Sequence, residues 1–159
     1  MAVTVLCVGK LRKRFYSEAV DEYRKRLGRL MPVSLVEVPD GREPENAAPA
    51  LCARVAHGEG ERILRQIGAR DYVIALCADA KQATSEELAD KLNTLLMEGK
   101  RHIVFVVGGS LGLSPTVLAR ANERVSMSRM TFPHQLARVM LMEQLYRAAK
   151  INAGERYHK

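Results

Sequence analysis

The chain has 159 residues, which is enough for one domain with a substantial apolar core and too few for two domains of ordinary size. Lys and Arg outnumber Asp and Glu by 25 to 18, so the chain carries a net charge of +7. This excess favours a polyanionic partner such as nucleic acid, although a solvated basic surface explains it equally well. Cys7, Cys52 and Cys77 show no metal-ligand spacing, which excludes a disulfide framework and a zinc site; we therefore expect no metal and a reducing compartment.

The beginning of the chain has no basic region ahead of its short apolar run, and no apolar stretch approaches the length of a membrane span, about 18 residues. The sequence therefore predicts a protein of the cytoplasm that does not enter a membrane.

In the first third of the chain, a β-branched run over residues 3–8 predicts a buried strand closed by Gly9 and Lys10. Apolar positions at helical spacing from Phe15 to Leu27 predict a helix, which Gly28 ends. A second strand is predicted over 33–38, and residues 42–49 lack any period, which is typical of a loop.

In the middle of the chain, a helical pattern covers residues 50–67, with Gly58 and Gly60 weakening it and Gly68 ending it. Residues 72–77 predict a third strand. Thr84, followed three residues later by Glu87, forms a capping box that begins a helix extending to Met97.

The last third begins with the most continuous apolar strand, residues 102–107, which ends at the glycine-rich run 108–112. Ser114 can cap a short helix over 115–122 whose first position is Pro115. An extended segment reaches residue 127, and a final helix starts at Pro133. Strands that alternate with helices predict an α/β fold with a mainly parallel sheet and helices on both faces, in a single domain over residues 1–159.

Ligands of open α/β sheets bind at the carboxyl ends of the strands, so the loops found there are candidate sites. The run 108–112 has three glycines in five positions, which fits a tight turn and a cofactor-binding loop equally well. A dinucleotide-binding fingerprint would lie in the first strand–helix unit instead, with an acid about 20 residues further on.

The final helix is apolar on opposite sides. Leu136, Met140, Glu143 and Arg147 fall on one face, whereas Leu141, Met142, Leu145 and Ala149 cover the other. A helix buried on both sides in so short a chain predicts a subunit interface, most simply a two-fold dimer.

Several polar residues near this helix have a structural and a functional interpretation. For the pair Glu143 and Arg147, at i and i+4, a structural ion pair is favoured, and for His134 a structural role is also favoured. His158, in a basic aromatic tail, is left open between the two. Cys7 and Cys77, at strand ends, are interpreted as core residues and not as nucleophiles.

Taken together, the motifs resemble the ribosomal RNA large subunit methyltransferase H family, small members of the SPOUT class, along the whole chain. The residues that carry this resemblance are Val8–Lys10, Val38–Pro39, Val106–Leu113, Ser126–Arg138, Glu143–Ala148 and Tyr157–His158. The last three segments, in this order, are highly specific.

The resemblance implies a trefoil knot in the C-terminal half, a homodimer, and an S-adenosyl-L-methionine pocket beside the knot. On the positions that match the family, the implied cofactor contacts are Leu76, Gly108, Met127, Ser128, Arg129, Met130, Thr131 and Phe132. Apolar side chains there can sandwich the adenine while loop backbone groups contact its edge.

The activity implied is methylation of N3 of a pseudouridine in 23S ribosomal RNA of the large subunit, on assembled ribosomes. The attacking nitrogen must lose a proton, so the candidate catalytic residues are His158 and Tyr157, with Arg138 or Arg129 holding phosphate or developing charge.

The loop after the third strand departs from the family. Relatives have an acid and then Gly-Lys after the strand leucine, whereas this chain has Ala80 in place of the glycine, and its acid, Asp79, lies two places later than in the family. Two alternative functions remain: a nicotinamide-dependent oxidoreductase that uses the loop 108–112, and a non-enzymatic ribosome-binding factor that uses only the basic surface.

Overall fold

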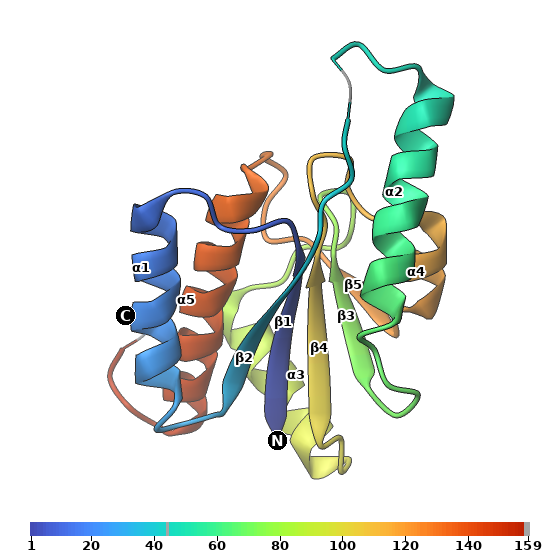
Figure 1. The fold of residues 1–159 in the computed structure, drawn as a ribbon. Helices are drawn as coiled ribbons and strands as arrows, with labels where there is room; N and C mark the ends of the chain where they lie inside the picture. Colours follow the sequence, from blue (N-terminus) through green and yellow to red (C-terminus); the bar gives the residue numbers. More distant parts are fainter. Residues whose placement is uncertain (44, 158–159) are drawn as a thin grey trace.

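The computed structural model of the chain describes residues 1–43 and 45–157. Its elements, labelled in Figure 1, are β1 (Ala2–Val8), α1 (Arg14–Leu27), β2 (Val33–Val38), α2 (Pro49–Leu64), β3 (Tyr72–Leu76), α3 (Ser85–Met97), β4 (His102–Val107), α4 (Pro115–Arg120), β5 (Glu123–Val125) and α5 (His134–Asn152). Each predicted strand and helix is confirmed, with boundaries that shift by a few residues.

The strands form one parallel sheet in the order β2-β1-β4-β3-β5. Every neighbouring pair is parallel, as expected for strands that are joined by crossover helices. The α/β prediction is therefore confirmed, and all carboxyl ends of the strands lie at one edge, which is the upper edge in Figure 1.

Helices cover both faces of the sheet. In β1, Val3, Val5 and Cys7 point into a core shared with α1, α3 and α5, whereas Leu6 and Val8 point into a second core shared with α2 and α4. Figure 1 shows the same division, with α1 and α5 on one side and α2 and α4 on the other. Because successive side chains of a strand alternate between faces, an apolar run without polar positions is what such a doubly covered strand requires.

Gly60 does not weaken α2 as the sequence pattern predicts. It lies where α2 crosses α4, and a Cβ atom on it would stand 2.1 Å from Ser114 Oγ. The helix continues unbroken through this point and ends at Leu64, three residues before the predicted end. Glycine is therefore required here for close packing of two helices.

The segment before α5 passes along the loop that follows β3. The backbone N–H of Ser126 donates to the Lys81 carbonyl at 2.9 Å, and the Ser126 hydroxyl donates to the Ala78 carbonyl at 3.2 Å. These bonds bring the two segments side by side at the carboxyl edge. Strand order and contacts do not define how the chain threads, so the trefoil knot stays a prediction.

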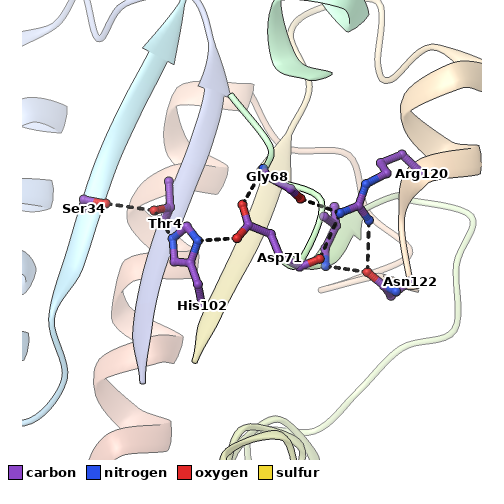
Figure 2. A network of polar contacts seen from close by, with 8 residues as sticks. Thr4, Ser34, Gly68, Asp71, His102, Arg120 and Asn122 are labelled. Carbon is purple, nitrogen blue, oxygen red and sulfur yellow. Dashed lines mark hydrogen bonds and ion pairs between the residues drawn. The ribbon is translucent and has the colours of Figure 1, made fainter. Parts of the chain in front are cut away.

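A polar network joins the strands near the opposite, amino edge of the sheet (Figure 2). His102 donates or accepts at both ring nitrogens, 2.8 Å from Thr4 Oγ1 and 2.8 Å from Asp71 Oδ1. Thr4 continues the chain of contacts to Ser34 at 3.0 Å, and Arg120 donates to the carbonyl oxygens of Gly68 and Asp71. The network links β1, β2 and β4 to the loop that precedes β3, far from the carboxyl edge.

Candidate active site

A cavity of about 420 Å³ lies at the carboxyl edge of the sheet. Three segments form it: the end of β3 with its following loop, the glycine-rich loop after β4, and the segment that leads into α5. Its lining residues are Leu76, Cys77, Ala78, Val107, Gly108, Gly109, Ser110, Gly112, Leu113, Ser126, Met127, Ser128, Met130, Thr131, Phe132, Pro133, His134 and Ala137. This is the volume and the position expected for a small-molecule site in an open α/β sheet.

Seven of the eight predicted cofactor contacts line this one cavity: Leu76, Gly108, Met127, Ser128, Met130, Thr131 and Phe132. Arg129 is the exception, because its side chain is exposed and does not line the cavity. The structure therefore brings together residues that lie more than 50 positions apart in the sequence.

The glycine-rich loop is a tight turn and also a wall of the cavity. Gly112 has a φ of +74°, and its N–H donates to the Gly109 carbonyl at 3.1 Å. A Cβ atom on Gly108 would stand 2.8 Å from the backbone of Gly112. The tight turn is thus confirmed, because its backbone needs glycine. The turn also borders the cavity, and its contact with a cofactor stays a prediction.

Glu59 packs against the glycine-rich loop, a contact that no sequence motif indicated. Its side chain is buried, Oε1 accepts the Gly41 N–H at 2.7 Å, and Oε2 has no partner among the described residues. Burial raises the pKa of this carboxyl, only partly opposed by the Gly41 hydrogen bond. A Cβ atom on Gly109 would meet Oε2 at 3.6 Å, so Glu59 lies directly against the turn.

The loop in which this chain departs from its family adopts an ordinary turn. The Ala80 N–H donates to the Cys77 carbonyl at 3.3 Å, and Ala80 is not among the described residues with a positive φ. The replacement of glycine by alanine therefore imposes no backbone strain. Leu76 and Cys77 still line the cavity in front of this turn.

The segment 126–133 holds its shape through its own hydroxyl groups. Ser126 Oγ donates to the Ser128 carbonyl at 2.8 Å, and the Met130 N–H donates to Ser128 Oγ at 3.0 Å. These side-chain hydrogen bonds take the place of the backbone hydrogen bonds that a helix or strand would have. They leave Met127, Met130 and Phe132 as an apolar wall of the cavity.

Two ionisable side chains, His134 and Cys77, line the cavity among the residues that the structure describes. Burial, together with the positive charge of Arg138, lowers the pKa of His134, which favours its neutral imidazole. Burial raises the pKa of Cys77, so the thiol is not activated as a nucleophile. Cys7 is fully buried and burial raises its pKa to about 12, as expected for a core residue.

The buried position of Arg138 does not favour the predicted role of holding phosphate or developing charge, which stays a prediction. Arg138 is fully buried, with 0 % of its side chain exposed. Its guanidinium donates to the carbonyl oxygen of Val8 and to Glu37 Oε1, the latter at 3.1 Å, while Nε has no partner among the described residues. Arg138 instead anchors α5 to the carboxyl ends of β1 and β2, beneath the cavity.

Tyr157 lies on the outer side of α5 and does not line the cavity. Its hydroxyl donates to Glu143 Oε1 at 3.2 Å, and its ring packs edge-on against Tyr146 and beneath Arg147. Burial and the negative charge of Glu143 raise the pKa of Tyr157 to about 12. Glu143 also binds Arg147 at 2.6 Å, so the predicted ion pair is present; His158 lies outside the described residues.

Among residues 1–43 and 45–157, no helix is long and apolar enough to cross a membrane. Over the same residues, no three His, Cys, Asp or Glu side chains are grouped so that they could hold a metal ion.

The fold and this cavity define an α/β protein with a parallel sheet and a cofactor-sized site at the carboxyl edge. The chain belongs to the SPOUT methyltransferase family, since residues 1–158 match the family described as "Predicted SPOUT methyltransferase".

Relatives and a solved structure agree with this family. Proteins from Bifidobacterium animalis subsp. lactis and Clostridium novyi are each 50% identical to this chain over 159 residues, and one from Exiguobacterium sibiricum is 48% identical. In each case 100% of both chains is covered, and each relative is named "Ribosomal RNA large subunit methyltransferase H". A probable methylase family protein from Haemophilus influenzae shares the fold, with a TM-score of 0.55 at 13% identity over 99% of this chain and 70% of its own.

Proposed function

We propose that the protein methylates N3 of a pseudouridine in 23S ribosomal RNA of the large ribosomal subunit, with S-adenosyl-L-methionine as methyl donor. It acts as a single catalytic domain over residues 1–159. The observation that carries this proposal is the one cavity that gathers seven of the eight predicted cofactor contacts, in a chain half identical to full-length relatives named for ribosomal RNA methylation.

The residues around the cavity fit S-adenosyl-L-methionine. Leu76, Met127 and Phe132 provide apolar surface for a flat purine, and the loops after β3 and β4 border it with backbone groups. No Lys or Arg side chain is among the described residues that line the cavity, so a cationic sulfonium would meet no like charge. When bound, this cofactor supplies an electrophilic methyl group.

The chain itself has to align the target nitrogen and accept its proton. His134 supports this role because it lines the cavity and its neutral form is favoured. His158 remains the second proposed acceptor, on the basis of the family resemblance. Tyr157 fits less well, because a hydroxyl with a pKa of about 12 that donates to Glu143 is a poor base near neutral pH.

A homodimer is part of the proposal. A second hollow of about 500 Å³ lies along α5 and is lined by Tyr23, Leu88, Val139 and Met140, among others. It shares Leu76, Ser126 and Met127 with the cofactor cavity. A second copy seated there would cover the half-buried face of α5 and stand next to the cofactor.

Mass spectrometry of large-subunit RNA tests the function. We expect cells that lack the gene to lose one methyl group on a pseudouridine, and the purified protein to restore it on ribosomes in the presence of S-adenosyl-L-methionine. An unchanged methylation pattern in the deletion strain would contradict the proposal. Restored methylation at normal rate by His158→Ala would remove His158 from the catalytic residues.

A further inference from the structure

Three segments lie at the carboxyl edge of the sheet beside the cofactor cavity, and besides the acids Asp40 and Glu43 they expose basic and apolar side chains. We call these basic and apolar side chains the rim; it consists of Lys10 and Lys13 after β1, Phe15 in the first turn of α1, Arg42 after β2, and Arg129 and Met130 before α5. The loops meet at the carboxyl edge of the sheet, the upper edge in Figure 1.

Two contacts connect the rim to the cavity. The Arg12 N–H donates to Gln135 Oε1 at 2.9 Å, which holds the loop after β1 beside His134. Ser110 Oγ donates to Glu43 Oε2 at 3.0 Å, which holds the loop after β2 against the glycine-rich wall. A ligand that enters the cavity therefore passes between these loops.

The rim has an excess of positive charge. Its four basic side chains form no ion pair with any other described residue, and all four are exposed: Lys10, Lys13, Arg42 and Arg129. Of the nearby acids, Asp40 and Glu18 are engaged by Arg12 and Arg14, and Glu43 accepts the Ser110 hydroxyl.

A second basic cluster, at the far end of α1, is neutralised in part. Its Arg26 binds Glu22 at 2.7 Å and Lys150 binds Glu155, whereas Lys25 and Arg29 form no ion pair with a described residue, and the cluster lies away from the cofactor cavity. Uncompensated cations beside the site are what attracts a polyanion, so the rim is the stronger candidate.

Two large apolar side chains stand among these cations. Phe15 is 61% exposed and Met130 is 71% exposed. A single exposed apolar residue is normal on a protein surface, but an accessible aromatic ring beside unpaired cations is the arrangement that binds single-stranded nucleic acid, where the cations contact phosphates and the ring stacks on a base.

We propose that the rim binds an unpaired stretch of RNA next to the target nucleotide. Lys10, Lys13 and Arg129 contact phosphates, and Phe15 stacks on a base beside the one that enters the cavity. Recognition of a splayed, single-stranded base is the common mode by which proteins select RNA loops over helices. This inference rests on the proposed function, because it takes RNA as the substrate.

Methyl transfer to assembled ribosomes that lack this methyl group tests the rim. We expect Phe15→Ala to raise the KM for ribosomes about 10-fold or more through loss of stacking, with the Kd for S-adenosyl-L-methionine unchanged. Phe15→Tyr keeps an aromatic face and should keep the KM. The double variant Lys10→Ala with Lys13→Ala should lower the salt dependence of binding to a short fluorescein-labelled single-stranded RNA, by about 1.4 in log–log slope.

Matched controls lie at the amino edge of the sheet. Met97→Ala removes an exposed apolar side chain, 81% exposed, and Arg70→Ala with Arg101→Ala removes two exposed charges. The rim proposal is overturned if the rim variants bind ribosomes and single-stranded RNA as these controls do. It is equally overturned if Phe15→Ala weakens duplex and single-stranded RNA alike. Wild-type protein that binds RNA through the rim but transfers no methyl would instead contradict the proposed function.

Discussion

At the scale of single residues, His134 is where the structure adds most to the sequence. A histidine beside a helix start is more often structural, yet this one faces the cofactor cavity and its pKa is lowered by burial and by the charge of Arg138. A neutral imidazole can accept a proton near neutral pH. Because the pKa of His134 is lowered, the imidazole stays neutral to a lower pH than an ordinary histidine does.

We therefore expect His134→Asn to lower kcat on ribosomes by about 100-fold or more, with a small effect on cofactor affinity. In the wild type, the rate should fall only as the pH drops below the ordinary histidine range, because protonation removes the acceptor. A pH profile of single-turnover methyl transfer measures both. Near-normal turnover of His134→Asn would leave His134 a structural residue and shift attention to His158.

Arg138 is the opposite of His134: the sequence predicted that it contacts substrate, and in the structure it is buried and joins α5 to β1 and β2. Its buried guanidinium donates to the Val8 carbonyl and to Glu37, and removing it takes this donor from the Val8 carbonyl and leaves Glu37 Oε1 with only the Leu11 N–H. We expect Arg138→Ala to lower the free energy of unfolding by about 3 kcal/mol. Denaturant titration followed by circular dichroism measures this, with the exposed Arg70→Ala as control. A stable Arg138→Ala protein that has lost only RNA binding would restore the original assignment.

At the scale of elements, the amino edge of the sheet depends on the network in Figure 2. Burial opposes ionisation of Asp71, but hydrogen bonds from His102 and from the Gly68 N–H, with the charge of Arg120, outweigh it and lower the pKa of this carboxyl. A carboxyl whose pKa is lower in the folded state stabilises the fold above its unfolded pKa, about 4, and this contribution is lost as the pH falls through the folded pKa.

We expect Asp71→Asn to destabilise the protein by about 1 kcal/mol at pH 7, because the ionic hydrogen bonds to His102 and Gly68 weaken. The difference from wild type should shrink as the pH falls below about 4, where the wild-type carboxylate becomes protonated too. Thermal melts from about pH 2 to about pH 7, a range that extends below the unfolded pKa of an aspartate, measure both proteins. A difference that stays constant across this range would show that the Asp71 charge is not involved.

Local sequence patterns predict the individual strands and helices of this fold best. Unbroken apolar strands indicated a sheet covered on both faces, and the capping box at Thr84 formed as its spacing implies, with both reciprocal hydrogen bonds present. Gly60 was misjudged because helix propensity contains no information about a neighbouring helix: only the crossing with α4 shows why glycine is needed. The three glycines of the loop 108–112 predicted the tight turn correctly. The packing of buried Glu59 against this turn could not be predicted, because the two segments are distant in the sequence.

The lining of the cavity was predictable from the family resemblance, both in the segment that holds Met127, Met130 and Phe132 and at the distant positions Leu76 and Gly108. Arg138 ends the same segment, but its burial depends on how α5 packs against β1 and β2, which no spacing rule gives. The structure also separates Tyr157 from the cavity, because Glu143, Arg147 and Tyr146 hold its ring on the outer side of α5.

At the scale of the whole molecule, the proposed homodimer depends on the face of α5 that is half-buried in one chain. Leu141, Met142 and Leu145 fill the core, while Leu136 and Met140 stay partly exposed, and Met140 lines the hollow that adjoins the cofactor cavity. An apolar stripe of this kind is costly to leave in water, and a self-complementary two-fold contact is the simplest way to cover it.

We therefore expect Met140→Lys to prevent dimerisation, because a lysine there would place two like charges in an apolar contact. Multi-angle light scattering should give wild-type protein twice the chain mass of 17.7 kDa and the variant a single chain mass. Met97→Lys adds the same charge at an exposed position of α3 and should remain dimeric. Since the hollow shares Leu76 and Met127 with the cofactor cavity, the monomeric variant should also lose methyl transfer. A fully active monomer would show that one chain holds the complete site.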